Sequence, residues 1–217
     1  MVSQLVDKDS IALDIGVYLG VFANVMAKYA KKVYAFEPHP DHFRFSKSAL
    51  PSNVEVINMA LSNEDGEAKL FVPIKYPSAG KVGASTDRKD VKEYVIKKTT
   101  LDRFNYTKIG LIKIDAEGHE FEILHGAAKT IAANKPNMII EIEQRHQKRN
   151  INEVFDYIKG FGYEGYFIDK DKVHKLADFT LDLQNIAHIG HPDYVNNFIF
   201  IPTEKISEWN KTVKDLI

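Results

Sequence analysis

Short apolar runs alternate with segments of helical periodicity along most of the chain. Residues 11–16 have the pattern of a buried strand. Apolar residues then recur at the three- and four-residue spacing of a helix that packs on it, namely Val21, Phe22, Val25, Met26 and Tyr29. Further strands are predicted at residues 31–38, 53–61, 66–73, 109–115, 137–143, and near 164–169 and 196–202. Further helices are predicted at residues 40–50, 120–134 and 151–162, with a terminal amphipathic helix around Trp209.

This alternation predicts an α/β fold. Strands and helices at such spacing form a mostly parallel sheet with helices on both faces, joined by right-handed crossovers. Residues 77–89 are rich in Gly, Ser and charge and have no hydrophobic period, so a mobile loop is expected there. We interpret residues 1–217 as one domain, a length that can bury roughly 70% of the surface of the unfolded chain.

Composition narrows the class of protein. Lys and Arg number 29 against 30 Asp and Glu, so no overall basic field favours nucleic acid or an acidic membrane, and neither is expected as a partner. The absence of cysteine excludes disulfides, thiolate metal sites and cysteine nucleophiles. Neither a signal peptide nor a membrane-spanning run is evident, which predicts a soluble, cytoplasmic protein.

Polar residues gather where the predicted strands end. In open parallel sheets, ligands bind at the carboxyl ends of the strands, at the point where the strand order reverses. These ends are therefore the place to look for a site. The polar residues there are Asp14, Glu37, Ser62, Asp115, Glu117, Glu141 and Glu143.

The turn after the first strand indicates the kind of ligand. Gly16 and Gly20 allow a tight turn before a helix, as in dinucleotide sites, but Tyr18 stands where the G-x-G-x-x-G fingerprint has its second glycine. The carboxylate of Asp14 would repel a pyrophosphate and would suit a cationic end such as an ammonium group. Glu37, about 20 residues further on, has the position and chemistry to hold the two hydroxyls of a ribose. A ribose joined to an amino acid, without phosphates, describes S-adenosylmethionine.

Several segments together resemble the FkbM-type S-adenosylmethionine-dependent methyltransferase family. They are LDIGVYLG, YAFEPHP, NVEVINMALSNEDGEAKLFV, TTLDRF, IGLIKIDAEGHEFEILHGA and KPNMIIEIE, in the family's order. The resemblance implies the class I methyltransferase fold, which is Rossmann-like and doubly wound around a mostly parallel seven-stranded sheet. One departure is Val17-Tyr18, where the family usually has Ala-Asn. Cofactor binding is therefore expected to depend more on backbone groups and on Asp14, Glu37 and Asp115.

Site residues follow from position and from this resemblance. Cofactor contacts are expected from Asp14, Gly16, Val17, Tyr18, Leu19, Gly20, Glu37, Pro38, Met59, Ala60, Leu61, Ser85 and Asp115. A general base is expected among Glu117, His119, Glu143 and His146. A Mg²⁺ site built from Asp115, Glu117, Glu141 or Glu143 is a less favoured alternative, because their spacing does not specify a metal.

Blander interpretations accompany these assignments. Asp14 could cap its turn, and Glu117 and Glu120 could simply be negative charges that are favoured near a helix start. His39 and His42 are expected to be solvated. Lys113 and Glu141, on what should be neighbouring strands, are expected to form a partly buried ion pair.

The resemblance implies methyl transfer to a hydroxyl of a sugar, a glycan or a similar small acceptor, and the near-neutral chain agrees with a neutral one. Residues 77–89 are the candidate lid, and aromatic residues at 163–168 could stack on a sugar. Two alternatives stay open, a nicotinamide-dependent oxidoreductase and a non-catalytic Rossmann-like binding domain. Because only ten residues precede the first strand, the chain could be a domain of a longer polypeptide and contact its other domains.

Overall fold

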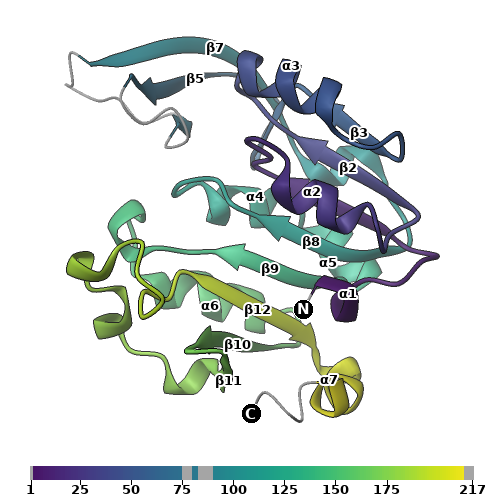
Figure 1. Cartoon of the computed structure of the whole chain (residues 1–217), viewed down its shortest axis with the longest axis vertical. Coiled ribbons are helices and arrows are strands. Elements are labelled where there is room, and N and C mark those ends of the chain that lie inside the picture. Colours follow the sequence, from purple (N-terminus) through teal and green to yellow (C-terminus); the bar gives the residue numbers. More distant parts are fainter. Residues whose placement is uncertain (1, 75–79, 83–89, 213–217) are drawn as a thin grey trace.

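The computed structural model describes residues 2–74, 80–82 and 90–212 (Figure 1). Its main sheet has eight strands in the order β11-β10-β12-β9-β8-β1-β2-β3. The strands are β1 (Ile11–Ile15), β2 (Lys32–Phe36), β3 (Val54–Ile57), β8 (Ile109–Ile114), β9 (Asn137–Glu141), β10 (Tyr163–Asp169), β11 (Lys172–Lys175) and β12 (Asn197–Pro202). Strands β3, β2, β1, β8 and β9 run parallel, whereas β12 is antiparallel to its neighbours β9 and β10. The α/β fold and the mostly parallel order expected from the sequence are confirmed.

Helices cover both faces of this sheet. The helices are α1 (Val2–Leu5), α2 (Val21–Met26), α3 (Pro40–Ala49), α4 (Glu120–Gly126), α5 (Ala128–Asn134), α6 (Ile151–Lys159) and α7 (Ile206–Thr212). On one face, α1, α2 and α7 pack around a core that includes Met26, Leu111 and Trp209. In Figure 1, α2 lies in front of the sheet and α5 and α6 lie behind it. The doubly wound arrangement is therefore confirmed.

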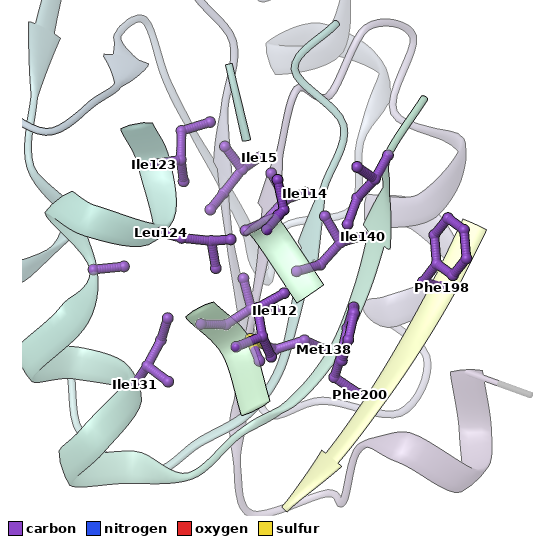
Figure 2. Packing of buried hydrophobic residues seen from close by; sticks show 14 of the residues in the cluster. Ile15, Ile112, Ile114, Ile123, Leu124, Ile131, Met138, Ile140, Phe198 and Phe200 are labelled. Carbon is purple, nitrogen blue, oxygen red and sulfur yellow. The ribbon is translucent and has the colours of Figure 1, made fainter. Parts of the chain in front are cut away.

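The opposite face carries the larger hydrophobic core. Ile123 and Leu124 of α4 and Ile131 of α5 point toward the side chains of β8 and β9 (Figure 2). Strand β8 supplies Ile112 to this core and its neighbour Leu111 to the other core, so the strand is buried on both faces. A central parallel strand in a doubly wound sheet requires this continuous apolar run.

A second, smaller sheet was not separated from the first by the sequence pattern. Its order is β4-β7-β5-β6, and it lies at the upper left of Figure 1, where β5 and β7 are labelled. The strands are β4 (Ala60–Leu61), β5 (Gly66–Pro73), β6 (Lys81–Val82) and β7 (Val91–Thr99). The strand expected at residues 66–73 exists, but it pairs antiparallel with β7 around a core of its own, which includes Leu70, Val72 and Ile96.

Two further details differ from the expectations. The main sheet has eight strands rather than seven, because Lys170 and Asp171 both adopt positive φ and form a tight turn that returns the chain as β11. The helix expected at residues 120–134 is broken at Ala127, next to Gly126, which packs so closely on Ser62 that a Cβ there would lie 1.9 Å from the Ser62 carbonyl oxygen.

Little of the expected lid can be described. Of residues 77–89, only 80–82 are among the described residues, and Lys81–Val82 forms β6 against β5. Ser85, expected to contact the cofactor, lies outside the described residues. Within the described ranges, no helix is both long enough and apolar enough to cross a membrane.

Candidate active site

A cleft opens where the chain leaves β1 for β2 on one side of the sheet and returns through β8 on the other. It encloses about 830 Å³, part of it open to solvent, between the strand ends and the second sheet. Ile15, Phe36 and Leu61 form apolar walls, and Leu70 and Val72 approach from β5. A reversal of strand order is where ligands bind in open α/β sheets, so the cleft lies where the sequence analysis placed it.

Most of the expected cofactor residues line this cleft, and some do not. Those that line it are Gly16, Tyr18, Glu37, Pro38, Met59, Ala60, Leu61 and Asp115, together with the base candidates Glu117 and His119. Those that do not are Asp14, Val17, Leu19 and Gly20. Asp14 and Val17 are buried behind the turn, and Leu19 is exposed. Gly20 adopts positive φ at the start of α2, and a Cβ there would meet Leu50, so its glycine serves packing.

The turn at Gly16 is fixed by a close approach of two strands. Gly16 has φ +83°, and a Cβ there would lie 1.7 Å from the carbonyl oxygen of Asp115. Tyr18 also adopts a left-handed φ of 51°, a conformation that asparagine tolerates better than tyrosine. The tyrosine ring packs edge-on against His42 and remains partly exposed in the cleft.

Glu37 ends β2 as a nearly buried carboxylate in the cleft. Its Oε2 accepts a hydrogen bond of 2.7 Å from the Tyr18 amide, and its Oε1 accepts one of 2.8 Å from the His39 amide. Burial raises the pKa of Glu37 to about 7, although both hydrogen bonds lower it. The carboxylate therefore fixes the Gly16–Tyr18 turn relative to β2, and each oxygen retains capacity for a ligand hydroxyl.

His39 and His42 are not solvated, contrary to the expectation. The side chain of His39 caps α3 by accepting from the amides of Asp41 and His42, and its ring stacks on that of His42 at 4.1 Å. Both rings line the cleft, and burial lowers the pKa of each. The sequence His39-Pro40 directly before a helical run was the available signal, since a capping side chain followed by proline marks a helix start.

Asp14 lies beneath α2 with its charge almost fully buried. It is 1% exposed, and neither carboxylate oxygen has a hydrogen-bond partner among the described residues. Burial raises its pKa to about 6, while Lys113, whose Nζ is 3.9 Å away, lowers it. Asp14 is therefore positioned to act on the cleft through Lys113 and the turn, since it does not line the cleft itself.

Lys113 pairs with Asp14 and Asp115 rather than with Glu141. Its Nζ lies 3.1 Å from Asp115 Oδ2, and Glu141 instead accepts a hydrogen bond from Asn196. Strand register gives the reason, because Lys113 is opposite Asp14 on β1 but opposite Ile139 on β9. Burial, with repulsion from Asp115 and Glu143, raises the pKa of Glu141 to about 8.

Glu117 occupies the turn between β8 and α4 in a strained conformation. Its φ is +50°, which a residue with a Cβ adopts only where its surroundings impose it. Its Oε2 lies 2.9 Å from His146 Nδ1, yet this buried atom has no hydrogen bond of normal geometry. Gly118 allows the approach, since a Cβ there would lie 2.5 Å from the His146 carbonyl oxygen. The turn thus places Glu117 between the cleft, which its side chain lines, and His146, beside which its Oε2 is buried.

Glu120, which the sequence placed near a helix start, also holds this turn in place. It is 2% exposed, and its Oε1 accepts hydrogen bonds from the amides of Ala116 and Gly118 at 3.1 and 3.0 Å. Its Oε2 accepts from the side chain of Gln147 at 2.6 Å. The charge near the helix start therefore belongs to Glu120, and Glu117 is left free to face the cleft.

The remaining base candidates differ in their surroundings. His119 lines the cleft, with Nε2 3.0 Å from the Ser62 hydroxyl, and burial lowers its pKa. Glu143 does not line the cleft, and both of its oxygens are held by Arg145, one of them also by Tyr194. Burial alone would raise the pKa of Glu143, but these hydrogen bonds bring it below its usual value.

The four carboxylates of the alternative Mg²⁺ site are directed to different partners. Asp115 faces Lys113, Glu117 faces His146, Glu141 faces Asn196 and Glu143 faces Arg145. Across residues 2–74, 80–82 and 90–212, no group of three or more His, Asp or Glu side chains is placed to hold a metal ion. This donor arrangement does not fit a divalent cation.

The chain has a Rossmann-like α/β fold that solved methyltransferase structures share. The chain superposes on an FkbM methyltransferase from Methylobacillus flagellatus with a TM-score of 0.56 at 16% identity, covering 89% of this chain and 43% of that one. It superposes on an rRNA methylase from Streptococcus thermophilus with a TM-score of 0.51 at 14% identity, covering 92% of this chain and 89% of that one. At these identities the likeness is one of fold.

Sequence comparison gives the family. The Methyltransferase FkbM domain matches residues 14–164, and the chain belongs to this family. It is 27% identical over 157 residues to the hexuronic acid methyltransferase AglP of Haloferax volcanii. That match covers 70% of this chain and 64% of the relative, so the chain spans just under two thirds of the relative's length. Membership of the family supports S-adenosylmethionine as the cofactor.

Proposed function

We propose that the protein is an S-adenosylmethionine-dependent O-methyltransferase that acts on a hydroxyl of a sugar or glycan. The charge of the cleft carries the proposal. Among the described residues that line it there are three carboxylates, Glu37, Asp115 and Glu117, and neither Lys nor Arg. Such a lining suits a nucleoside with a cationic end and disfavours the pyrophosphate of a nicotinamide dinucleotide.

Glu37 and Asp115 suit the two ends of that cofactor. Glu37 is held by two backbone amides at the end of β2, and we assign it the ribose hydroxyls. Asp115 ends β8 next to Gly16, with one oxygen on Lys113, and we assign it the methionine end. Met59, Ala60 and Leu61 supply an apolar wall and backbone groups for the adenine.

Glu117 is the preferred group to take the proton. When bound, the cofactor supplies a methyl group on a positively charged sulfur, and the acceptor hydroxyl loses its proton as its oxygen becomes methylated. The Glu117 carboxylate lines the cleft and can accept that proton, and His146, whose Nδ1 lies 2.9 Å from its buried Oε2, can relay the proton outward. Glu143 is less suited to this role, because Arg145 and Tyr194 already occupy its oxygens. The likeness to a hexuronic acid methyltransferase supports a sugar as the acceptor.

Two measurements test the proposal. Isothermal titration with S-adenosylmethionine and with NAD distinguishes a methyltransferase from a nicotinamide-dependent oxidoreductase, and we expect binding of the first only. Incubation with labelled S-adenosylmethionine and a panel of sugars then distinguishes an enzyme from a binding domain. Binding of NAD instead, or binding of S-adenosylmethionine without methylation of any sugar, would contradict the proposal. The absence of a nucleic-acid partner stays a prediction, and an RNA in the panel tests it.

A further inference from the structure

A second hollow adjoins the cofactor cleft on the far side of Glu117. It encloses about 700 Å³ and shares Val82, Glu117 and His119 with the cleft. Its other walls come from β6 and from the segment that follows β9, which contributes His146 and Arg149. A molecule in this hollow would meet a cofactor in the cleft at the carboxylate that we assign as the base.

The charge of this hollow is opposite in kind to that of the cleft. Three basic side chains line it, Lys81, Lys148 and Arg149, against the carboxylates of Glu117 and Glu122. Arg149 is already engaged, because its Nη2 lies 3.3 Å from Glu122 and its guanidinium lies 3.8 Å above the ring of Phe121. Lys148 is exposed. Of these three basic side chains, the one that remains is Lys81 of β6.

Lys81 is half-buried and has no close anionic partner among the described residues. Within them, no carboxylate oxygen lies within 4 Å of its Nζ, and Glu117, Glu120 and Glu143 act on it only over longer distances. Burial lowers the pKa of Lys81, and these carboxylates counteract that shift. A half-buried ammonium without a contact partner gains from an anion that reaches it, through a charge-assisted hydrogen bond.

We propose that this hollow binds the methyl acceptor, and that Lys81 recognises a carboxylate on it. The inference rests on the proposed function and narrows its substrate class to acidic sugars. A uronic acid would place a ring hydroxyl at Glu117 and its carboxylate at Lys81. An acidic acceptor then replaces the neutral acceptor that the near-zero net charge of the chain suggested. The net charge averages 29 basic and 30 acidic residues, so it does not reveal the excess of basic side chains in this hollow.

The test compares three acceptors that differ only at one group: a uronic acid glycoside, its methyl ester and the corresponding neutral hexoside. With labelled S-adenosylmethionine, we expect kcat/KM to be ~10-fold or more higher for the acid than for either neutral compound. Lys81→Gln should remove most of this preference by raising KM for the acid, with less than about twofold change for the hexoside. Lys97→Gln, an exposed lysine of the same small sheet, is the matched control and should change neither value.

Each other outcome has a defined meaning. Equal turnover of acid and hexoside by the parent protein would contradict the acidic acceptor and leave the proposed function intact. Equal loss on both acceptors in Lys81→Gln would mean that Lys81 acts through Glu117, which also contradicts the proposal. A product that loses its methyl group in mild alkali would be an ester, so the carboxylate would be the attacking group and not an anchor. Methylation of none of the three, with S-adenosylmethionine still bound, would overturn the proposed function as well.

Discussion

The two hollows that meet at Glu117 are built from different parts of the fold. The cleft that we assign to the cofactor, called here the cofactor cleft, is formed mainly by the ends of parallel strands, where Gly16 and Glu37 are fixed by backbone contacts on both sides. The hollow beside it is formed by the turn before α4, the segment after β9 and the two-residue strand β6. The first is acidic without a cation among its described lining, and the second carries three basic side chains.

This difference shows how one fold can keep its binding site for the methyl donor while it varies its binding site for the methyl acceptor. A cofactor site on strand ends is positioned by the hydrophobic cores, so changing it disturbs the whole sheet. An acceptor site on loops and on a small added sheet can change its charge without such a cost. Glu117 lines both hollows. Glu120 fixes the turn that carries Glu117 by accepting hydrogen bonds from the amides of Ala116 and Gly118.

The largest expected effect is on stability and comes from a change in the cofactor cleft, at Gly16. Gly16→Ala would bring a Cβ to 1.7 Å from the Asp115 carbonyl oxygen, and we expect it to lower the free energy of unfolding by about 3 kcal/mol or more. Gly190→Ala is a matched control, because Gly190 has φ +82° but nothing within 4 Å of its Cβ position. It should cost about 1 kcal/mol, from backbone strain alone. Urea unfolding of both variants measures the difference, and equal losses would mean that the strand contact at Gly16 is unimportant.

At the boundary between the compartments, Glu117→Gln keeps the shape of the side chain and removes its charge. We expect kcat to fall by ~10²-fold or more, with the Kd of S-adenosylmethionine nearly unchanged, as when a group acts only in the transition state. Asp115→Asn should instead raise that Kd as well as lower turnover, because we assign Asp115 to the methionine end of the cofactor. Glu67→Gln, at an exposed carboxylate of β5 that lines neither hollow, serves as the control. If Glu117→Gln turns over at the parental rate, the base must be sought at His119 or His146.

On the cofactor side, Glu37→Ala should weaken S-adenosylmethionine binding by about 1 to 3 kcal/mol, through loss of a charge-assisted acceptor for the ribose. The variant should also be less stable by about 1 kcal/mol, because the amides of Tyr18 and His39 would lose their acceptor. Titration calorimetry and thermal unfolding of the variant measure the two effects separately. Unchanged cofactor affinity would remove Glu37 from the site.

The parallel strand ends could be predicted because their signal is local. A buried strand, a glycine turn and a carboxylate about 20 residues later all fall within one short stretch of the sequence, and Glu37 lines the cleft as expected. Asp115 could be placed in the same cleft because it also ends a parallel strand. The partner of Lys113 could not be predicted, because it depends on a register between β1 and β8 that brings together residues 14 and 113. The alternation of side chains along each strand favoured Glu141 as the partner, but it gives no information about the register between strands.

The acceptor side was hidden for a related reason. Strand β6 has two residues, too few for a periodic signal, and it exists only by pairing with Leu70 and Phe71 of β5. Lys81 therefore had no predicted place near Glu117. The stretch from residue 144 to 149 is rich in Arg, Lys and His, but only the fold shows that it faces β6 across one hollow.

Cofactor affinity should depend on pH through Glu37. The pKa of this carboxyl is raised to about 7, and only the ionised form accepts from two ribose hydroxyls, so affinity should fall by up to ~tenfold for each pH unit below 7. Stability should respond in the opposite sense. A raised folded-state pKa means that the contribution of Glu37 to stability is complete below its unfolded value of 4.5 and is lost as pH rises through 7. Titrations at pH 5.5, 7 and 8.5 should show the affinity step, and Glu37→Gln should flatten it; a step that persists in this variant would assign the proton to Asp14 or the histidines.

The smallest expected effect is that of removing divalent metal. Each of the four candidate carboxylates faces its own partner, and their arrangement among the described residues holds no group of three metal donors. A proton acceptor supplied by the chain needs no metal to lower the pKa of the acceptor hydroxyl. We therefore expect the initial rate of methyl transfer to change by less than about twofold in EDTA, and Mg²⁺ added afterwards to have no effect. Loss of activity in EDTA, restored by Mg²⁺ and abolished by Asp115→Asn, would show instead that the boundary between the two hollows is completed by a cation.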